Sequence, residues 1–185
     1  DLKREAALIY NRELLLGDIP ALHHDIYTNG IGYFRLIFKI HDIPASFFPY
    51  IGVLKTLFCN LNTEHYSYAE LCNEINLATG EIFVAQNNYG DAFDVDKCTS
   101  TMEFCTKALY GNLERALELM GEMILTSDFS DEKRLREVLA ENNSKSREFM
   151  MQAGHAVASG RALSYYGSVK DAVDEELSGI SQYRF

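Results

Sequence analysis

The sequence predicts an α+β domain, with an antiparallel sheet and helices packed on one face of that sheet. Strand-like segments rich in β-branched and aromatic residues occur in two groups, within residues 6–41 and residues 81–110. Helical periodicity fills the stretch between these groups and the stretch after them. This segregated order favours an antiparallel sheet over a doubly wound parallel one. No Pro-, Gly- or Ser-rich linker divides the 185 residues, so we expect one domain.

The first group reads as three strands. They are separated by turn residues at Gly17–Pro20 and Thr28–Gly30. The third strand is the clearest, because apolar residues alternate with polar or amphipathic ones. We expect one face to carry Phe34, Leu36, Phe38 and Ile40, and the other Tyr33, Arg35 and Lys39.

Two helices follow. Ser46 is the expected cap of the first, Pro49 fits its first turn, and the helix is predicted from about Phe47 to Leu61. The second begins at Ser67, whose capping box is completed by Glu70. We expect it to end at Thr79–Gly80, with the glycine in the left-handed conformation.

The rest of the chain predicts two strands and then helices. The strands are joined by a polar turn around Asn87–Asp91. A helix follows, marked by Leu113, Leu117, Met120 and Ile124, and another starts at Ser130 and is expected to continue to about Leu163. After a break at Tyr166–Ser168, a last helix runs to Gly179.

Composition excludes several classes of partner. The formal net charge is −10, and the basic region Lys133–Arg147 is interleaved with glutamates. Nucleic acids and anionic membranes both require a basic patch, so neither is expected as a partner. No stretch approaches the roughly 20 apolar residues of a membrane span, and the start does not resemble a signal peptide. The cysteines, Cys59, Cys72, Cys98 and Cys105, are expected to be reduced and buried, as in a cytosol-like compartment.

Glu64-His65 forms the second half of H-x-x-E-H, an inverted zinc signature of metallopeptidases. That signature needs both histidines on one helix, with the glutamate acting on a zinc-bound water. Leu61 occupies the first histidine position and cannot bind zinc. The pair is also predicted to lie between two helices, which favours coincidence.

Other titratable residues favour structural roles. His23 and His24 are adjacent in a predicted strand and point to opposite faces, so they favour structural or surface roles; a metal site built from either with His41 is the alternative. His155 has no histidine or carboxylate four residues on. The acidic cluster Asp171, Asp174, Glu175 and Glu176 is expected to be a solvated helix face, with a cation or basic-peptide contact as the alternative. We find no serine-nucleophile elbow or phosphate-binding glycine loop, and assign no catalytic, cofactor or metal residue.

Four segments, in order, resemble the presequence-protease branch of the pitrilysin and insulinase zinc metallopeptidases. They are DIYTNGIGYFRLIF, NTEHYSYAELCNEINLATGEI, LERALELMGEMILTSDFSDEKRLREVLAE and AGHAVASGRALSYYGSVKDAVDEELSGISQYRF. The resemblance covers about Ala6 to Phe185. In that family four related α+β domains form two bowl-like halves that enclose an unfolded peptide.

The resemblance implies that this chain corresponds to the third, non-catalytic domain, and that Glu64-His65 is a coincidence. Zinc would belong to the first domain of the parent, and no cofactor to this segment. The implied partners are sister domains of the parent chain and short or unfolded peptides. The alternative is an inactive relative that acts as a scaffold or interaction module.

Further expectations follow from the interpretation of this chain as a fragment of a longer protein. Because residue 1 is Asp, we expect a piece of a longer chain, with residues 1–5 a linker remnant and residues 1–185 one domain. The expected location is a bacterial cytoplasm, or alternatively an organelle matrix. Its acidic balance predicts attraction of basic peptides to the chamber wall. An exposed apolar patch on a long helix around Phe149–Val157 predicts self-association of the fragment.

Overall fold

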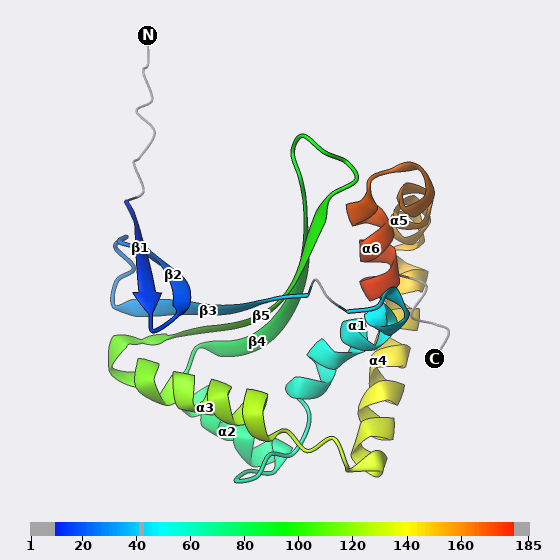
Figure 1. The fold of residues 1–185 in the computed structure, drawn as a ribbon. Helices are drawn as coiled ribbons and strands as arrows, with labels where there is room; N and C mark the ends of the chain where they lie inside the picture. The colour runs from blue at the N-terminus through cyan, green and yellow to red at the C-terminus, as the bar shows by residue number, and fades with distance from the viewer. Residues whose placement is uncertain (1–9, 41–42, 180–185) are drawn as a thin grey trace.

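The computed structural model describes residues 10–40 and 43–179 and has the predicted α+β architecture (Figure 1). Residues 1–5, expected as a linker, residues 6–9 of the first predicted strand, and His41 lie outside the described residues. The elements, in order, are β1 (Asn11–Leu16), β2 (Ile19–His24), β3 (Ile31–Lys39), α1 (Phe48–Phe58), α2 (Tyr68–Ala78), β4 (Glu81–Gly90), β5 (Cys98–Leu109), α3 (Leu113–Thr126), α4 (Glu132–Gln152), α5 (Gly154–Tyr166) and α6 (Val169–Ser178). Short 3-10 turns precede α1 and α3.

Strand β5 is the centre of a three-stranded antiparallel sheet, between β3 and β4. The register aligns Arg35 with Cys105 and Cys105 with Phe83. Strands β1 and β2 form a separate antiparallel hairpin. Two tight turns use left-handed backbone, at Gly17 within this hairpin and at Asn29–Gly30 before β3.

The helices cover one face of the sheet. The strand residues in the core all have even numbers, as one face of a strand requires; they are Phe34, Leu36, Ile82, Val84, Met102 and Phe104, and Ile40 directly after β3 continues the same face. Figure 1 shows a bent sheet, with α2 and α3 along one part and α1 and α6 along the other, on the same side. Within the part of the chain that the structure describes, the opposite side carries no helix and forms an open face.

Phe104 is the central aromatic residue of the core. Its ring makes edge contacts with Phe38 on β3 and Phe58 on α1, at centroid distances of 5.8 and 5.2 Å. Phe58 also meets Phe129 edge-on at 5.7 Å, after α3. Edge-to-face geometry stabilises an aromatic pair beyond the contribution from burying the rings. These contacts join the sheet to the first helix and to the segment that leads to α4.

The predicted helix caps are partly confirmed. Ser67 and Glu70 form the capping box, and Pro49 lies in the first turn of α1. The prediction for Ser46 is wrong, because Ser46 lies inside the preceding 3-10 turn and makes no cap bond. The prediction for Gly80 is also wrong. The backbone of this glycine is not left-handed. Its N–H donates to the Lys107 carbonyl, and β4 begins at the next residue.

Three predicted boundaries need correction. The prediction of a turn around Asn87–Asp91 is wrong, because β4 continues to Gly90 and the loop spans residues 91–97. Helix α4 begins after Asp131, whose carboxylate accepts from the Arg134 N–H. The prediction of one continuous helix to about Leu163 is wrong, because Ala153 is not helical and separates α4 from α5. Alanine favours helices, so periodicity could not show this break.

Two expectations about burial also change. On α3 the fully buried side is Ala116, Leu119, Met120 and Met123, a stripe rotated from the predicted one. The cysteines are free thiols, but only Cys105 is buried, while Cys59 and Cys72 are exposed. Cys59 ends α1 and Cys72 lies on α2, where apolar neighbours in the sequence do not ensure burial.

Candidate functional site: the open face of the sheet

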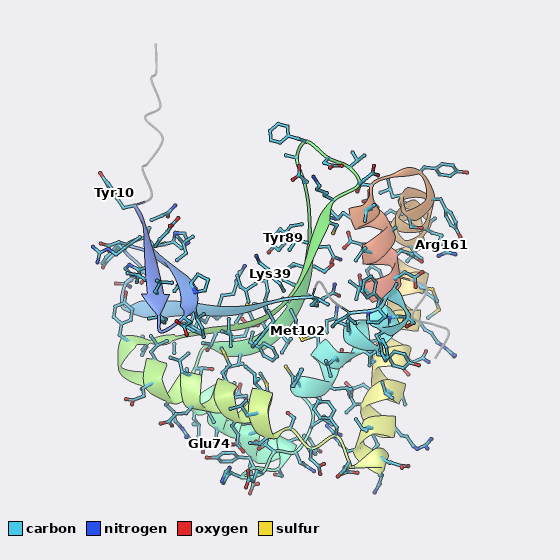
Figure 2. The ribbon with its side chains drawn as sticks, in the orientation of Figure 1. Tyr10, Lys39, Glu74, Tyr89, Met102 and Arg161 are labelled. Carbon is cyan, nitrogen blue, oxygen red and sulfur yellow. The ribbon has the colours of Figure 1, made fainter. Side chains whose placement is uncertain are left out.

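The candidate site is the sheet face that none of the described helices covers. We call it the open face, and it consists of Tyr33, Arg35, Ile37 and Lys39 from β3, Thr99, Thr101, Glu103, Cys105 and Lys107 from β5, and Glu81, Phe83, Ala85, Asn87 and Tyr89 from β4. Figure 2 shows Lys39 and Tyr89 extending from the side of the sheet opposite the helices. Tyr33, Ile37, Phe83 and Tyr89 are exposed. The face therefore offers apolar and aromatic surface to solvent.

A buried carboxylate lies at its centre. Glu103 is fully buried, although it lies on the open face. Its Oε1 accepts hydrogen bonds from the Tyr89 hydroxyl at 2.9 Å and the Thr101 hydroxyl at 2.7 Å. Its Oε2 lies 3.2 Å from Nη1 of Arg35, whose side chain is 55% exposed. Oε2 has no hydrogen-bond partner among the described atoms, so its contact with Arg35 is an ion pair without a well-directed hydrogen bond.

The network holds Glu103 ionised. Burial raises the pKa of this carboxyl, but hydrogen bonds from Thr101, Asn87 and Tyr89, together with the charge of Arg35, outweigh burial and hold the pKa below its usual range. The same hydrogen bond raises the pKa of Tyr89. At neutral pH the carboxylate is charged and the phenol is protonated. The Tyr89 hydroxyl and the Glu103 carboxylate are hydrogen-bonded to each other, so the arrangement supports binding and positioning rather than acid–base chemistry.

Sequence reasoning placed Arg35 on this face but missed the network. The available signal was Glu103 itself, a charged residue between Met102 and Phe104 in a strand of β-branched and apolar residues. A carboxylate in such a strand needs a partner. The cross-strand partners could not be named without the register, because Arg35 lies on β3 and Tyr89 on β4.

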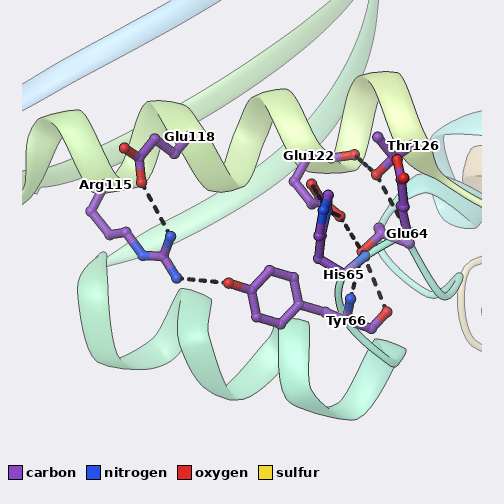
Figure 3. A network of polar contacts seen from close by, with 8 residues as sticks. Glu64, His65, Tyr66, Arg115, Glu118, Glu122 and Thr126 are labelled. Atoms are coloured by element: carbon purple, nitrogen blue, oxygen red, sulfur yellow. Dashed lines mark hydrogen bonds and ion pairs between the residues drawn. The ribbon is translucent and has the colours of Figure 1, made fainter.

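Glu64 and His65 lie in the connection between α1 and α2, as predicted, and they are structural (Figure 3). The backbone N–H of His65 donates to Glu122 Oε1 at 3.0 Å, and the imidazole Nδ1 lies 3.1 Å from both carboxylate oxygens. The N–H of Glu64 donates to the Thr126 hydroxyl at 3.4 Å. Nearby, Arg115 bonds the Tyr66 hydroxyl at 3.1 Å and the Glu74 carboxylate on α2 at 2.8 Å. The loop is thus fixed to α3.

The residues at Glu64-His65 do not fit a zinc site. Leu61, at the first position of the signature, is completely buried and has no donor atom. The imidazole faces a carboxylate of α3 instead of a second histidine. Within residues 10–40 and 43–179, no three His, Cys, Asp or Glu side chains are grouped so that they could hold a metal ion.

The other histidines are separated. His23 and His24 lie on opposite faces of β2, and Nδ1 of His24 lies 2.6 Å from the Asn11 side-chain oxygen on β1. His155 is exposed on α5. His41, the partner of the β2 histidines in the alternative metal site, is outside the described part of the chain.

The acidic cluster on α6 is not a solvated face. Asp171 completes a capping box with Ser168, Asp174 pairs with Lys170, and Glu175 is buried and 3.1 Å from Nη1 of Arg161. Glu176 is half-buried. The expectation of a solvated run is therefore wrong, because α6 packs against β4, α1 and α5. These carboxylates mainly stabilise the fold.

A cavity of about 780 Å³ lies among α1, α4, α5 and α6. It is lined in part by Phe149, Met150 and Val157, in the region predicted to be an apolar patch. Phe149 and Met151 are exposed, as expected, although the helix that was to carry them is broken. The buried carboxylate at this cavity is Glu175, which Arg161 neutralises. The cavity therefore presents a packing surface rather than a reactive group.

Among the described helices, none has the length and apolar character to cross a membrane.

Comparison with known proteins agrees with this picture. The family described as Peptidase M-16C associated matches residues 1–185. Protein HypA of Clostridium perfringens is 30% identical over 185 residues, which is 100% of this chain and 19% of that protein. The mitochondrial presequence protease of Saccharomyces cerevisiae is 32% identical over 163 residues (85% of this chain, 16% of the relative), and that of Xenopus tropicalis is 27% identical over 171 residues (91% and 16%).

The chain thus spans less than a fifth of the length of these relatives. The family match covers every residue, and the predicted resemblance is confirmed. The chain therefore belongs to the Peptidase M-16C associated family and is a domain of the pitrilysin and insulinase type, similar to a region of the presequence proteases.

Proposed function

We propose that this domain forms part of the wall of a peptide-enclosing chamber in a larger zinc-dependent oligopeptidase. The observation that carries the proposal is the one-sided packing of the sheet. The helices cover one face, and the open face keeps Tyr33, Ile37, Phe83 and Tyr89 exposed. Exposed aromatic and apolar groups on the face of a sheet suit an extended peptide, which can spread its side chains across neighbouring strands.

In this proposal the domain does not perform the chemistry. The zinc ion and its ligands belong to the first domain of the parent protein, and peptide hydrolysis is an activity of the whole assembly. An opposing wall would confine short or unfolded peptides and exclude folded proteins, and closure would orient the peptide and limit bulk water. The open face would turn toward the peptide, and helical surfaces would contact sister domains.

The compartment is also a proposal. HypA comes from a bacterium, which supports the bacterial cytoplasm that we propose. The names of the other two relatives include "mitochondrial", which supports an organelle matrix as the alternative.

Site-specific photocrosslinking tests the peptide-facing role. A photoreactive phenylalanine replaces Ile37 on the open face of this chain, or Leu125 on α3 as the control. Each variant is then mixed with a labelled unfolded peptide and irradiated. Both positions are exposed aliphatic side chains, on the sheet side and the helix side respectively. We expect the peptide to crosslink at position 37 and much less at position 125. Equal crosslinking at both positions contradicts the proposal. A scaffold would instead crosslink to a folded protein and not to the peptide.

A further inference from the structure

We propose that the open face selects peptides that carry a carboxylate, which binds at Arg35 and Lys39. This inference rests on the proposed function, because it requires the open face to meet the peptide. It also differs from the expectation drawn from composition, in which the net charge of −10 attracts basic peptides.

The charges on the open face have the opposite balance from the whole chain. Its cations are Arg35, Lys39 and Lys107, and its anions are Glu81 and Glu103. Lys107 pairs with Glu81 at 2.8 Å, and Arg35 pairs with Glu103 at 3.2 Å. Among the described residues no ion pair is found for Lys39, which is exposed. The acidic excess of the chain therefore lies elsewhere.

Arg35 is held by a group that cannot fully satisfy it. A guanidinium has five N–H donors in a planar fork. Nη1 lies 3.2 Å from Glu103, whose carboxylate already accepts hydrogen bonds from Tyr89 and Thr101, and the guanidinium also interacts with the Cys105 thiol on β5. With its side chain 55% exposed, Arg35 can offer its other donors to a ligand. Carboxylate is the ligand whose two oxygens match the guanidinium fork.

Lys39 extends this site along the same strand. It lies four residues from Arg35 on the same face, about 13 Å away at the usual rise of a strand. Ile37 lies between them and is exposed. An extended peptide could place an apolar side chain on Ile37 while a carboxylate reaches either cation. The ligand class is therefore an extended peptide with an acidic or C-terminal carboxylate next to an apolar residue.

Fluorescence anisotropy with four matched peptides tests this assignment. The peptides are unstructured and equal in length, and all have amidated C-termini except one. They carry two glutamates, two glutamines or two lysines at the same positions; the fourth is the glutamine peptide with a free C-terminus. We expect the glutamate peptide to bind this chain more tightly than the glutamine peptide, and the lysine peptide least tightly. The advantage should fall as salt is raised. The free C-terminus reports whether a terminal carboxylate suffices.

Two lysine variants locate the effect. Lys39→Gln should weaken binding of the glutamate peptide about two- to five-fold, the scale of an exposed ion pair, and leave the glutamine peptide unchanged. Lys133→Gln removes an exposed lysine from α4 and should change neither. Arg35→Lys keeps the charge but removes the fork, and should weaken the glutamate peptide while circular dichroism confirms the fold.

Equal binding of the four peptides, tighter binding of the lysine peptide, or the same loss in both lysine variants overturns the inference. If peptides crosslink at Ile37 without a charge preference, the proposed function stands and only the selectivity fails. If no peptide crosslinks there, both fail.

Discussion

Nδ1 of His65 lies 3.1 Å from each carboxylate oxygen of Glu122, and the His65 backbone N–H reaches the same carboxylate at 3.0 Å. One acidic side chain of α3 therefore holds both the main chain and the ring of a residue in the α1–α2 connection. Burial raises the pKa of Glu122, but the hydrogen bonds from His65, Thr63 and Thr126 outweigh burial and lower the pKa to about 2.

Glu122→Gln should destabilise the domain in a pH-dependent manner. A carboxyl whose pKa falls from 4.5 to about 2 on folding stabilises the folded state above pH 4.5, and loses that contribution as the pH falls toward 2. We expect the variant to lower the free energy of unfolding by about 1–3 kcal/mol near neutral pH, and the difference to shrink below pH 4.5. Urea unfolding across pH measures it. Glu118→Gln is the control on the same helix. A difference that does not depend on pH would rule out the charge as the cause.

Ser67→Ala should cost about 1 kcal/mol of unfolding free energy, because the capping box of α2 is lost. Ser46→Ala should cost little, since Ser46 makes no cap bond. Urea unfolding of both variants separates a cap that the structure contains from one that only the sequence suggests. Equal losses would contradict the assignment of the caps.

Arg35 and Glu103 should respond unequally to truncation. Arg35→Met leaves a buried carboxylate without its cation, and should lower the unfolding free energy by about 2–4 kcal/mol. Glu103→Gln leaves a guanidinium that reaches water, so about 1 kcal/mol is expected. Thermal and urea unfolding of both single variants and of the double variant complete the cycle. The double variant should recover part of the Arg35→Met loss. A larger loss in Glu103→Gln than in Arg35→Met would refute the role of burial.

Phe104→Ala should lower the unfolding free energy by about 3–5 kcal/mol, because it leaves a cavity between the sheet and α1. Phe93→Ala is the matched control, because Phe93 is 100% exposed in the β4–β5 loop. It should leave stability nearly unchanged. A loss at Phe93 comparable to that at Phe104 would show that the loop is packed in solution.

The element order and the core face of β3 were predictable because each depends on local pattern. The alternation of Phe34 and Leu36 with Tyr33 and Arg35 depends only on the two-residue repeat of a strand. The Ser67–Glu70 box is likewise complete within four residues. The break at Ala153 was not predictable, because α5 folds back onto α6 and that contact is tertiary.

The candidate site was less predictable than the fold. Glu103 meets Arg35 and Tyr89 only through the pairing of three strands, and no sequence spacing encodes that pairing. The acidic residues of α6 were misjudged for the same reason, since Glu175 is neutralised by Arg161 from another helix. Electrostatic roles depend on which charges become neighbours, whereas net composition only counts them.

The central position of β5 also sets an order of events during synthesis. Both partners of this strand, β3 and β4, precede it in the chain, and Ile31 cannot pair until Leu109 has left the ribosome. Until then the growing chain carries two unpaired strands and the apolar surfaces of α1 and α2. Such intermediates expose strand edges that invite aggregation. The nascent domain is therefore most vulnerable just before its middle strand is complete.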